Sequence, residues 1–217
     1  MFRDLPDLLG RITAELHRLD SGPLQASLRE LNGVAAGEPF GFLAQLRESA
    51  DLLGRSDLID ATDWLSAHPP ASRTTVIAHG DLHPFNVLVD GDRWNLLDWS
   101  TALIADPAYD LAFTTLILAN PPLVAPSPLR PAIRKAGASI ARRFGTAYRR
   151  AGGHTPDAGT LDWYTSLHAL RILTQQAGWG DDARNPEFAS HPWTSLGPIA
   201  ARELTRTTGV VVVSPGS

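Results

Sequence analysis

Apolar residues recur every three or four positions along most of the chain, and this spacing places them on one face of an α-helix. The first run predicts an amphipathic helix over residues 5–19 that ends near residues 20–23. Its His17 lies beside the apolar stripe, where we expect a surface or hydrogen-bonded core histidine and not a metal ligand. Gly54 would end the second helix, and Ser56 would cap the third. The further helices predicted in this way cover residues 40–53, 57–67, 109–119, 131–151 and 160–177.

The middle of the chain has β character. Residues 74–78 are rich in β-branched side chains, and the apolar runs 86–89 and 94–97 flank the turn signal Asp90-Gly91-Asp92. This pattern predicts a short strand, a loop and a β-hairpin. The valines at 210–213 could form an edge strand or a frayed end. Because strands and helices do not alternate along the chain, we expect a mostly helical α+β fold and not a doubly wound parallel sheet.

Composition and charge narrow the functional classes. The chain has 217 residues, of which 43% are apolar, enough for a real core in one large domain or two small ones. The formal net charge is −4, which argues against a nucleic-acid partner or an anionic membrane surface, because both require clustered basic residues. A small or cationic partner is more compatible with this charge.

Cysteine is absent, which removes disulfides, thiolate nucleophiles and cysteine-ligated zinc. A metal would therefore have to bind to Asp, Glu, Asn or His. Lys135 is the only lysine. The first residues lack the apolar core of a signal peptide, and no window approaches about 18 consecutive apolar residues. A cytoplasmic location is the simplest interpretation.

A polar cluster occupies the β region, in the stretch HGDLHPFNVLVDGDRWNLLDWS. Asp81 follows the first strand and lies five residues before Asn86, so a tight loop can bring their side chains together. The hairpin then folds back and returns Asp98 to the neighbourhood of Asn86. A carboxylate and an amide oxygen suit Mg²⁺, which takes few protein ligands. Asp81, near the metal but not bound to it, could accept a proton from an attacking hydroxyl, as phosphoryl transfer requires.

These residues also carry a resemblance. HGDLHPFN fits the H-x-D-x-x-x-x-N catalytic loop of protein-kinase-like enzymes. With LLDWS after the hairpin and DPAYDLA beyond it, the ordered set resembles the aminoglycoside phosphotransferase and choline kinase-like family. The resemblance implies a protein-kinase-like C-terminal lobe, in which Asp81 is the catalytic base and Asn86 a metal ligand. Asp98 takes the place of the Asp in the D-F-G motif and would hold the metal of the nucleotide.

The resemblance implies roles for five further residues. His79 would brace the catalytic loop, and Asp110 would anchor that loop through backbone hydrogen bonds. Asp106 would do the same or face the substrate. His83 occupies the position at which many protein kinases carry a lysine, so it could touch the γ-phosphate. Leu88 would lie under the nucleotide base.

Two other interpretations compete with this one. Asp and Asn in loops usually cap turns, although the five-part cluster of His79, Asp81, His83, Asn86 and Asp98 is unusual for that role. Alternatively, His79, Asp81 and His83 alternate as H-x-D-x-H and could bind Zn²⁺ together with a later histidine, as in a metallohydrolase. That interpretation leaves Asn86 and Asp98 unexplained, and Pro84 would break the strand. The candidate later histidines are His154, His168 and His191.

The resemblance covers about residues 5–195, with 196–217 as a C-terminal tail, and makes 1–217 a single C-terminal lobe. In such enzymes a preceding β-rich lobe supplies a glycine-rich cover, a strand Lys and a helix Glu that contact or support the nucleotide. No glycine-rich loop follows a strand before His79, and Lys135 falls on a later helix. We therefore expect the N-terminal lobe to be absent and the chain to be weakly active or inactive. The surface that would face this lobe could then favour self-association.

The leading hypothesis is an ATP- or GTP-dependent phosphotransferase that moves the γ-phosphoryl group to a hydroxyl of a small molecule, with Mg²⁺ as cofactor. The alternative is a non-catalytic kinase-like lobe that acts as a binding module. A cationic acceptor would favour acidic loops, although exposed acids are usually only solvated. The acidic residues at the positions where the family places substrate contacts are Asp157, Asp162, Asp181, Asp182 and Glu187.

Overall fold

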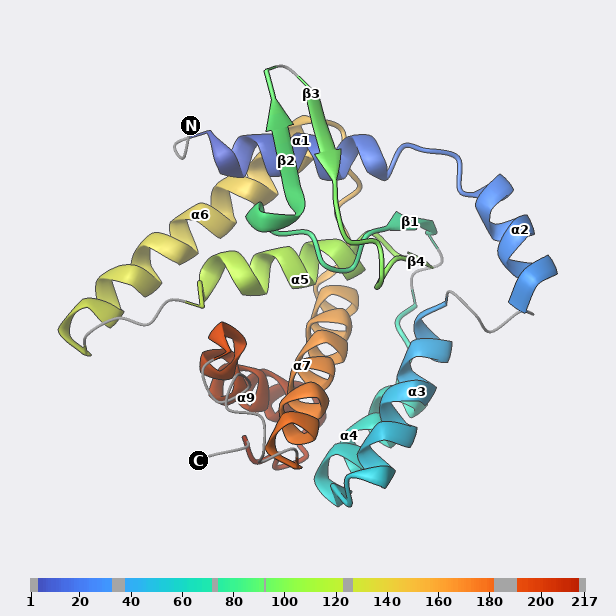
Figure 1. Cartoon of the computed structure of the whole chain (residues 1–217), viewed down its shortest axis with the longest axis vertical. Helices are drawn as coiled ribbons and strands as arrows, with labels where there is room; N and C mark the ends of the chain where they lie inside the picture. Colours follow the sequence, from blue (N-terminus) through green and yellow to red (C-terminus); the bar gives the residue numbers. More distant parts are fainter. Residues whose placement is uncertain are drawn as a thin grey trace.

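Helices form most of the molecule, and two small antiparallel sheets lie among them (Figure 1). The computed structural model describes residues 4–32, 38–71, 74–91, 93–122, 127–181 and 191–214. The mostly helical α+β fold predicted from the sequence is confirmed. In the described residues, no helix is both long enough and apolar enough to cross a membrane.

Four helices precede the β region. Gly54, with a positive φ of 64°, follows the third of them, as the sequence predicts. Ser56 is the first residue of the fourth helix and does not cap it, because Arg55 stands at the cap position and no side-chain cap bond forms. The four are α1 (Leu5–Leu16), α2 (Gly22–Asn32), α3 (Pro39–Leu52) and α4 (Ser56–Ala67).

Two strand pairs build the β region. β1 (Val76–Ala78) pairs with β4 (Leu103–Ala105), and the 3₁₀ turn η1 (Pro84–Asn86) leads into the hairpin of β2 (Val87–Asp90) and β3 (Arg93–Leu96). Asp90 pairs with Arg93, so two residues form the hairpin turn. The first of these, Gly91, has a φ of 58°, and Asp92 lies outside the described residues.

The second half of the chain is helical. Figure 1 shows α5 crossing below the hairpin, α6 rising at an angle to meet α1, and α7 descending from α5 beside α3 and α4. The predicted helices over 109–119, 131–151 and 160–177 are confirmed, with small shifts at their ends. The elements are α5 (Ala108–Ala119), η2 (Ser127–Leu129), α6 (Arg130–Arg150), α7 (Ala158–Asp181), η3 (Pro192–Leu196) and α9 (Gly197–Thr208).

The core has two clusters that flank the loop after β1. The larger joins α3, α4, α7 and α9 with β1 and one side of α5. The smaller joins α1, α6 and the other side of α5, and it includes Leu82 from the loop after β1. That loop is therefore held between two packed bodies, while the β2–β3 hairpin extends beyond them (Figure 1).

Two helices were not predicted. Gly22-Pro23 reads as the end of a helix, but α2 begins there, because a proline is well accommodated in the first turn, where its missing N–H would be unpaired anyway. The expected tail contains α9, which packs against α7 through side chains such as Leu204.

The segment after α9 is neither an edge strand nor a frayed end. It has no regular secondary structure, yet Val212 is buried and the backbone of Val213 bonds to the side chains of Arg55 and Asp57. β4, at three residues, was also missed, because it is too short to show an alternating pattern.

Candidate functional site

Asp110 holds the loop that follows β1. Its carboxylate lies in the first turn of α5 and accepts the backbone N–H groups of His79 (3.0 Å) and Gly80 (2.6 Å). His17 of α1 completes the set, with Nε2 3.0 Å from the same carboxylate. Burial acts to raise the pKa of Asp110, but these hydrogen bonds outweigh it and the pKa is lowered. A fully buried carboxylate thus stays ionised and ties two residues of the loop to α5.

His17 is a hydrogen-bonded core histidine, as predicted. Its Nδ1 lies 3.0 Å from the hydroxyl of Tyr148 on α6, and its Nε2 donates to Asp110. This chain of contacts links α1, α6 and α5. The helix predicted over residues 5–19, for which the sequence indicates no role in the site, therefore leads into one of the groups that support the loop.

His79 connects the loop to the end of the hairpin. Its Nε2 lies 2.9 Å from the carbonyl oxygen of Leu97, which can only accept, so Nε2 carries the proton. Its Nδ1 accepts the backbone N–H of Asp81 at 3.3 Å. The ring also contacts that of Trp99, with 4.9 Å between centroids. His79 thus has the contacts that a brace of the loop needs.

Gly80 has a φ of 76°, a conformation that L-residues with a side chain rarely adopt. A Cβ at this position would collide with the carbonyl oxygen of Thr101 and with the ring of Tyr109. The backbone reverses here in very little space. Only glycine lets the chain deliver Asp81 to its position directly after the strand.

The Asp81 carboxylate is held on both of its oxygens. Oδ2 accepts from Nδ2 of Asn86 at 3.1 Å and lies 3.5 Å from Nε2 of His83. Oδ1 lies 3.3 Å from Nη2 of Arg171, which comes from α7. The residue is 8% exposed, so the carboxylate lies at the edge of the buried region and can still be reached. The predicted meeting of the Asp81 and Asn86 side chains is confirmed.

Three opposing effects set the pKa of Asp81. Burial acts to raise it, while the hydrogen bond from His83 and the positive charge of Arg171 act to lower it, and the net direction is downward. His83 Nδ1 accepts the backbone N–H of Phe85, so a neutral His83 ring carries its proton on Nε2, facing Asp81. Asp81 is therefore an ionised carboxylate at neutral pH.

Asn86 and Asp98 flank the hairpin. Asn86 stands directly before β2, Asp98 lies two residues after the end of β3, and the backbone N–H of Leu97 donates to the carbonyl of Asn86 at 2.9 Å. Asp98 has a φ of 59°, the only positive φ at a non-glycine position in the described residues. Strained backbone of this kind is concentrated at functional sites.

The donor set fits a hard cation. The amide nitrogen of Asn86 is engaged by Asp81, which leaves the amide oxygen as the atom of that side chain suited to a metal. Asp98 is exposed, and hydrogen bonds from Ser100 lower its pKa, so it stays ionised. In the described part of the chain, no group of three or more His, Cys, Asp and Glu side chains could hold a metal. Two oxygen donors completed by water and phosphate suit Mg²⁺ better than Zn²⁺.

The zinc interpretation finds no support in the contacts of its histidines. His79 donates to Leu97, as described above. His168 is fully buried in α7, with Nε2 2.8 Å from the carbonyl of Tyr109. Nδ1 of His191 accepts the backbone N–H of Trp193.

Two other predicted residues have defined surroundings. Asp106 is buried and its carboxylate accepts the backbone N–H of Ala108 at 2.8 Å, in the first turn of α5. Leu88 lies on β2 opposite Asn95 and is 55% exposed, so its side chain remains accessible to a ligand beside the hairpin.

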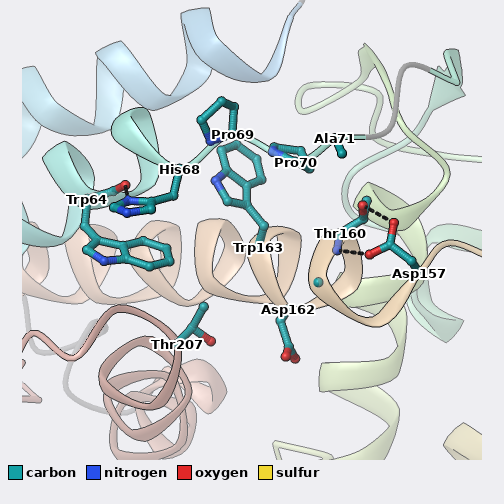
Figure 2. Close-up of a pocket in the computed structure, with 11 residues that line it drawn as sticks. Trp64, His68, Pro69, Pro70, Ala71, Asp157, Thr160, Asp162, Trp163 and Thr207 are labelled. Atoms are coloured by element: carbon teal, nitrogen blue, oxygen red, sulfur yellow. Dashed lines mark hydrogen bonds between the residues drawn. The ribbon is translucent and has the colours of Figure 1, made fainter.

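Acidic residues near α7 are placed differently from the expected substrate contacts. Asp157 and Asp162 line a pocket of about 390 Å³ between the end of α4, α7 and α9, and none of the residues around Asp81 lines it (Figure 2). Asp157 accepts from Thr160, and Asp162 pairs with Arg206. Both carboxylates are thus engaged within the protein. Asp181 ends α7, while Asp182 and Glu187 lie outside the described residues.

Arg171 is the site residue that sequence reasoning missed. It lies ninety positions after Asp81, too far for any local motif to connect them. A signal was present, because Arg171 stands among Leu167, Leu170 and Leu173 in a helix whose pattern is otherwise apolar there. A cation in such a stretch indicates a buried pair.

The phosphotransferase enzyme family matches residues 3–164 of this chain, which include the Asp81 loop, the hairpin and the Asp110 anchor. The chain belongs to this family. No curated protein matches the sequence at a significant level. The family resemblance predicted from the HGD loop and its companions is thereby confirmed, whereas Arg171 lies beyond the matched range.

Two solved structures of phosphotransferases share the fold. A protein from Ralstonia eutropha JMP134, described provisionally as an aminoglycoside phosphotransferase, is 17% identical with a TM-score of 0.62, and the alignment covers 95% of this chain. Spectinomycin phosphotransferase APH(9)-Ia, in complex with ADP and spectinomycin, is 16% identical with a TM-score of 0.51 and 93% of this chain covered. At these identities the likeness shows the fold alone. The chain spans 64% of the length of each structure.

Proposed function

We propose that this phosphotransferase-family chain carries the catalytic residues for ATP- or GTP-dependent transfer of the γ-phosphoryl group to a hydroxyl of a small molecule. One observation carries the proposal: an ionised Asp81 is fixed on both carboxylate oxygens, by Asn86 on one and by Arg171 on the other. Phosphoryl transfer needs such a positioned proton acceptor together with neutralised phosphate charge.

Asp81 is the proton acceptor in this scheme. The acceptor hydroxyl oxygen forms a bond to the γ-phosphorus, and the bond between that phosphorus and the β–γ bridging oxygen breaks. The hydroxyl proton passes to the Asp81 carboxylate, and the nucleoside diphosphate leaves with the bridging oxygen. Because the pKa of Asp81 is lowered, proton transfer to it is favourable only as the hydroxyl loses electron density, late in the reaction.

Asn86, through its amide oxygen, and Asp98 would hold Mg²⁺, which when bound neutralises charge on the nucleotide phosphates. His83 lies between Asp81 and Phe85, where its ring can turn from the carboxylate toward a γ-phosphate. Leu88, exposed on β2, offers an apolar surface to a base. Asp110 and His79 would support these groups through the backbone of the loop and of the hairpin end, without contact to the reactants. Asp106 caps the start of α5 and has no assigned role in the reaction.

The acceptor is proposed only as a small alcohol. The solved spectinomycin enzyme binds ADP and spectinomycin, which makes a nucleotide and a hydroxylated small molecule reasonable partners for this chain. The acids expected to face a cationic acceptor do not favour an aminoglycoside over a neutral alcohol, because Asp157 and Asp162 are engaged elsewhere.

The proposal is tested by replacing Asp81 with Asn, which preserves shape and removes the proton acceptor. Transfer of the γ-phosphoryl group is measured with ATP and with GTP, in the presence of Mg²⁺, across a panel of aminoglycosides, spectinomycin and neutral sugar alcohols. The assay uses the 217-residue chain and the longest natural polypeptide that contains it. We expect Asp81→Asn to lower kcat by about 10³-fold, the scale of a lost general base.

Asp162→Asn is the matched control, because it removes a carboxylate from α7 that pairs with Arg206 at the remote pocket. It should leave kcat unchanged. Undiminished transfer by Asp81→Asn would overturn the proposal. Tight binding of Mg²⁺ and ADP with no transfer to any acceptor would favour the alternative, a non-catalytic nucleotide-binding lobe.

A further inference from the structure

Arg171 is a buried cation directed at the catalytic loop from a distant helix. Its side chain is 6% exposed. Nη1 donates to the carbonyl of Gly80 at 2.9 Å, and Nη2 lies 3.3 Å from Oδ1 of Asp81. One planar guanidinium therefore contacts the backbone of one residue and the side chain of the next. The guanidinium of an arginine, with several donors at fixed angles in one plane, can make both contacts at once, whereas the compact ammonium group of a lysine cannot.

Two aromatic rings make this position tolerable for a cation. The guanidinium carbon lies 5.3 Å from the centre of the Phe113 ring on α5 and 5.6 Å from that of Trp193 in η3. Burying a charge is costly unless it is paired, and both the ring faces and the Asp81 carboxylate supply compensation. Three segments far apart in the sequence thus converge to keep this guanidinium in place.

The consequence is that Asp81 has separate partners on its two oxygens. Asn86 and His83 hold Oδ2, and both belong to the same loop as Asp81, so they move with it. Among the residues that the structure describes, Arg171 is the one that connects the carboxylate to the helical body. It also holds the Gly80 carbonyl, the peptide group whose orientation depends on the unusual φ of Gly80.

We propose that Arg171 is a positioning residue for phosphoryl transfer, which fixes the carboxylate of Asp81 and the Gly80 peptide in the orientation that accepts the hydroxyl proton. The inference rests on the function proposed above and adds a residue outside the matched family range. Two of the five N–H donors of Arg171 face the loop, and its side chain is only 6% exposed, so we assign it to the Asp81 carboxylate and not to the reacting atoms.

The test replaces Arg171 by Gln and by Lys. Gln keeps a donor and removes the charge, while Lys keeps the charge and loses the planar fork. We expect Arg171→Gln to lower kcat by about 10²-fold with little change in KM for either substrate, because small misplacements of a catalytic group cost about that much. Arg171→Lys should recover part of kcat. Arg206→Gln, which breaks the exposed pair with Asp162, is the control and should leave kcat unchanged.

A second measurement separates this inference from the proposed function. Crystal structures of the wild type and of both Arg171 variants give the Asp81 side-chain rotamer and the direction of the Gly80 carbonyl. A displaced carboxylate in Arg171→Gln supports the inference even if no acceptor is found and the proposed function fails. If Arg171→Gln does not fold, the kcat and the Asp81 rotamer of Arg171→Lys are compared with those of the wild type instead.

Three results would overturn the inference. They are a kcat within about twofold of the wild type, a loss of activity that appears as a raised KM, and an unchanged Asp81 rotamer without Arg171. The first and third mean that the loop holds Asp81 without help from α7. The second means that Arg171 binds substrate.

Discussion

At the scale of single residues, the loop around Asp81 depends on backbone conformations that its sequence neighbours permit. Gly80 turns the chain with a φ of 76°, and Asp98 adopts a φ of 59° after the hairpin. Asp is among the few residues with a side chain that tolerate this region, because its carboxylate can bond locally, here to Ser100. Glycine and aspartate thus turn the chain at the residue before Asp81 and at Asp98 itself.

Gly80→Ala should destabilise the fold far more than a comparable change in the hairpin. A Cβ at position 80 adds the strain of a positive φ, about 1 kcal/mol, to a collision with Thr101 and Tyr109 that nothing can relieve cheaply. We expect a loss of about 3 kcal/mol in the free energy of unfolding, measured with urea. Gly91→Ala is the control, since its φ of 58° is similar but no atom lies within 4 Å, and it should cost about 1 kcal/mol. Equal losses would show that the close approach to Tyr109 is unimportant.

The residues of the site differ in how far the sequence could predict them. Asp81 and Asn86 are five positions apart in one loop, so their meeting follows from spacing alone. His17 supports the loop indirectly, through Asp110, which lies 93 positions further along the chain, and Arg171 contacts Asp81 from 90 positions away. Only tertiary packing brings these residues together. Local pattern carries no information about such contacts.

At the scale of elements, the periodicity of apolar residues predicted the helices that bury an apolar stripe, but it did not predict α2, β4 and α9. α2 begins at Gly22-Pro23, a pair that also marks helix ends, and β4 has three residues. α9 carries its apolar positions at Ala200, Ala201 and Leu204, which is a weak stripe of small side chains. β4 and α9 are set by what they pack against, which the sequence does not state.

The contact between α1 and α6 depends on glycine at position 10. A Cβ there would lie 2.6 Å from the backbone nitrogen of Tyr148 and 2.7 Å from the Cβ of Ala147, so the helices would have to separate. We expect Gly10→Ala to lower the free energy of unfolding by about 2 kcal/mol, despite the better helix propensity of alanine. Because His17 follows on the same helix, the change should also weaken its contact with Asp110.

Gly145→Ala provides the matched control within α6. The nearest atom to its added Cβ is an Arg149 nitrogen at 3.6 Å, so alanine fits without strain. It should raise stability by up to about 1 kcal/mol through helix propensity alone. Chemical denaturation of both variants checks the pair, and a change of the same sign in both would contradict close packing of α1 on α6.

At the scale of the whole molecule, α5 is shared by the two core clusters and carries Asp110 and Phe113 toward the loop. The loop is therefore coupled to the stability of the entire lobe and not only to its own hydrogen bonds. Leu82 shows this directly, because its side chain is buried in the smaller cluster and its carbonyl accepts from Thr114 of α5. Loss of global packing should disorganise the loop around Asp81 at the same time.

His168 makes that global stability depend on pH. Nε2 bonds to the carbonyl of Tyr109, and Nδ1 is buried with no partner in the described residues. Burial and the nearby Arg171 lower the pKa of His168 to about 3. The unfolded chain, with a pKa near 6.5, therefore binds a proton that the folded chain refuses. The contribution of His168 to the free energy of unfolding is therefore constant above about pH 7 and declines as the pH falls below 6.5.

Between pH 7.5 and pH 5.0, His168 should lower the free energy of unfolding by about 2 kcal/mol. His168→Gln keeps a donor for Tyr109 but has no group that titrates in this range. Urea unfolding of the wild type and of His168→Gln at the two pH values gives the decline in the free energy of unfolding of each protein. The difference between the two proteins at pH 7.5 measures the packing that the variant has lost, and it is subtracted. Carboxylates such as Asp110 contribute to both proteins and cancel in the comparison. We expect the decline to be about 2 kcal/mol smaller in the variant, and equal declines would show that His168 is protonated without cost in the folded lobe.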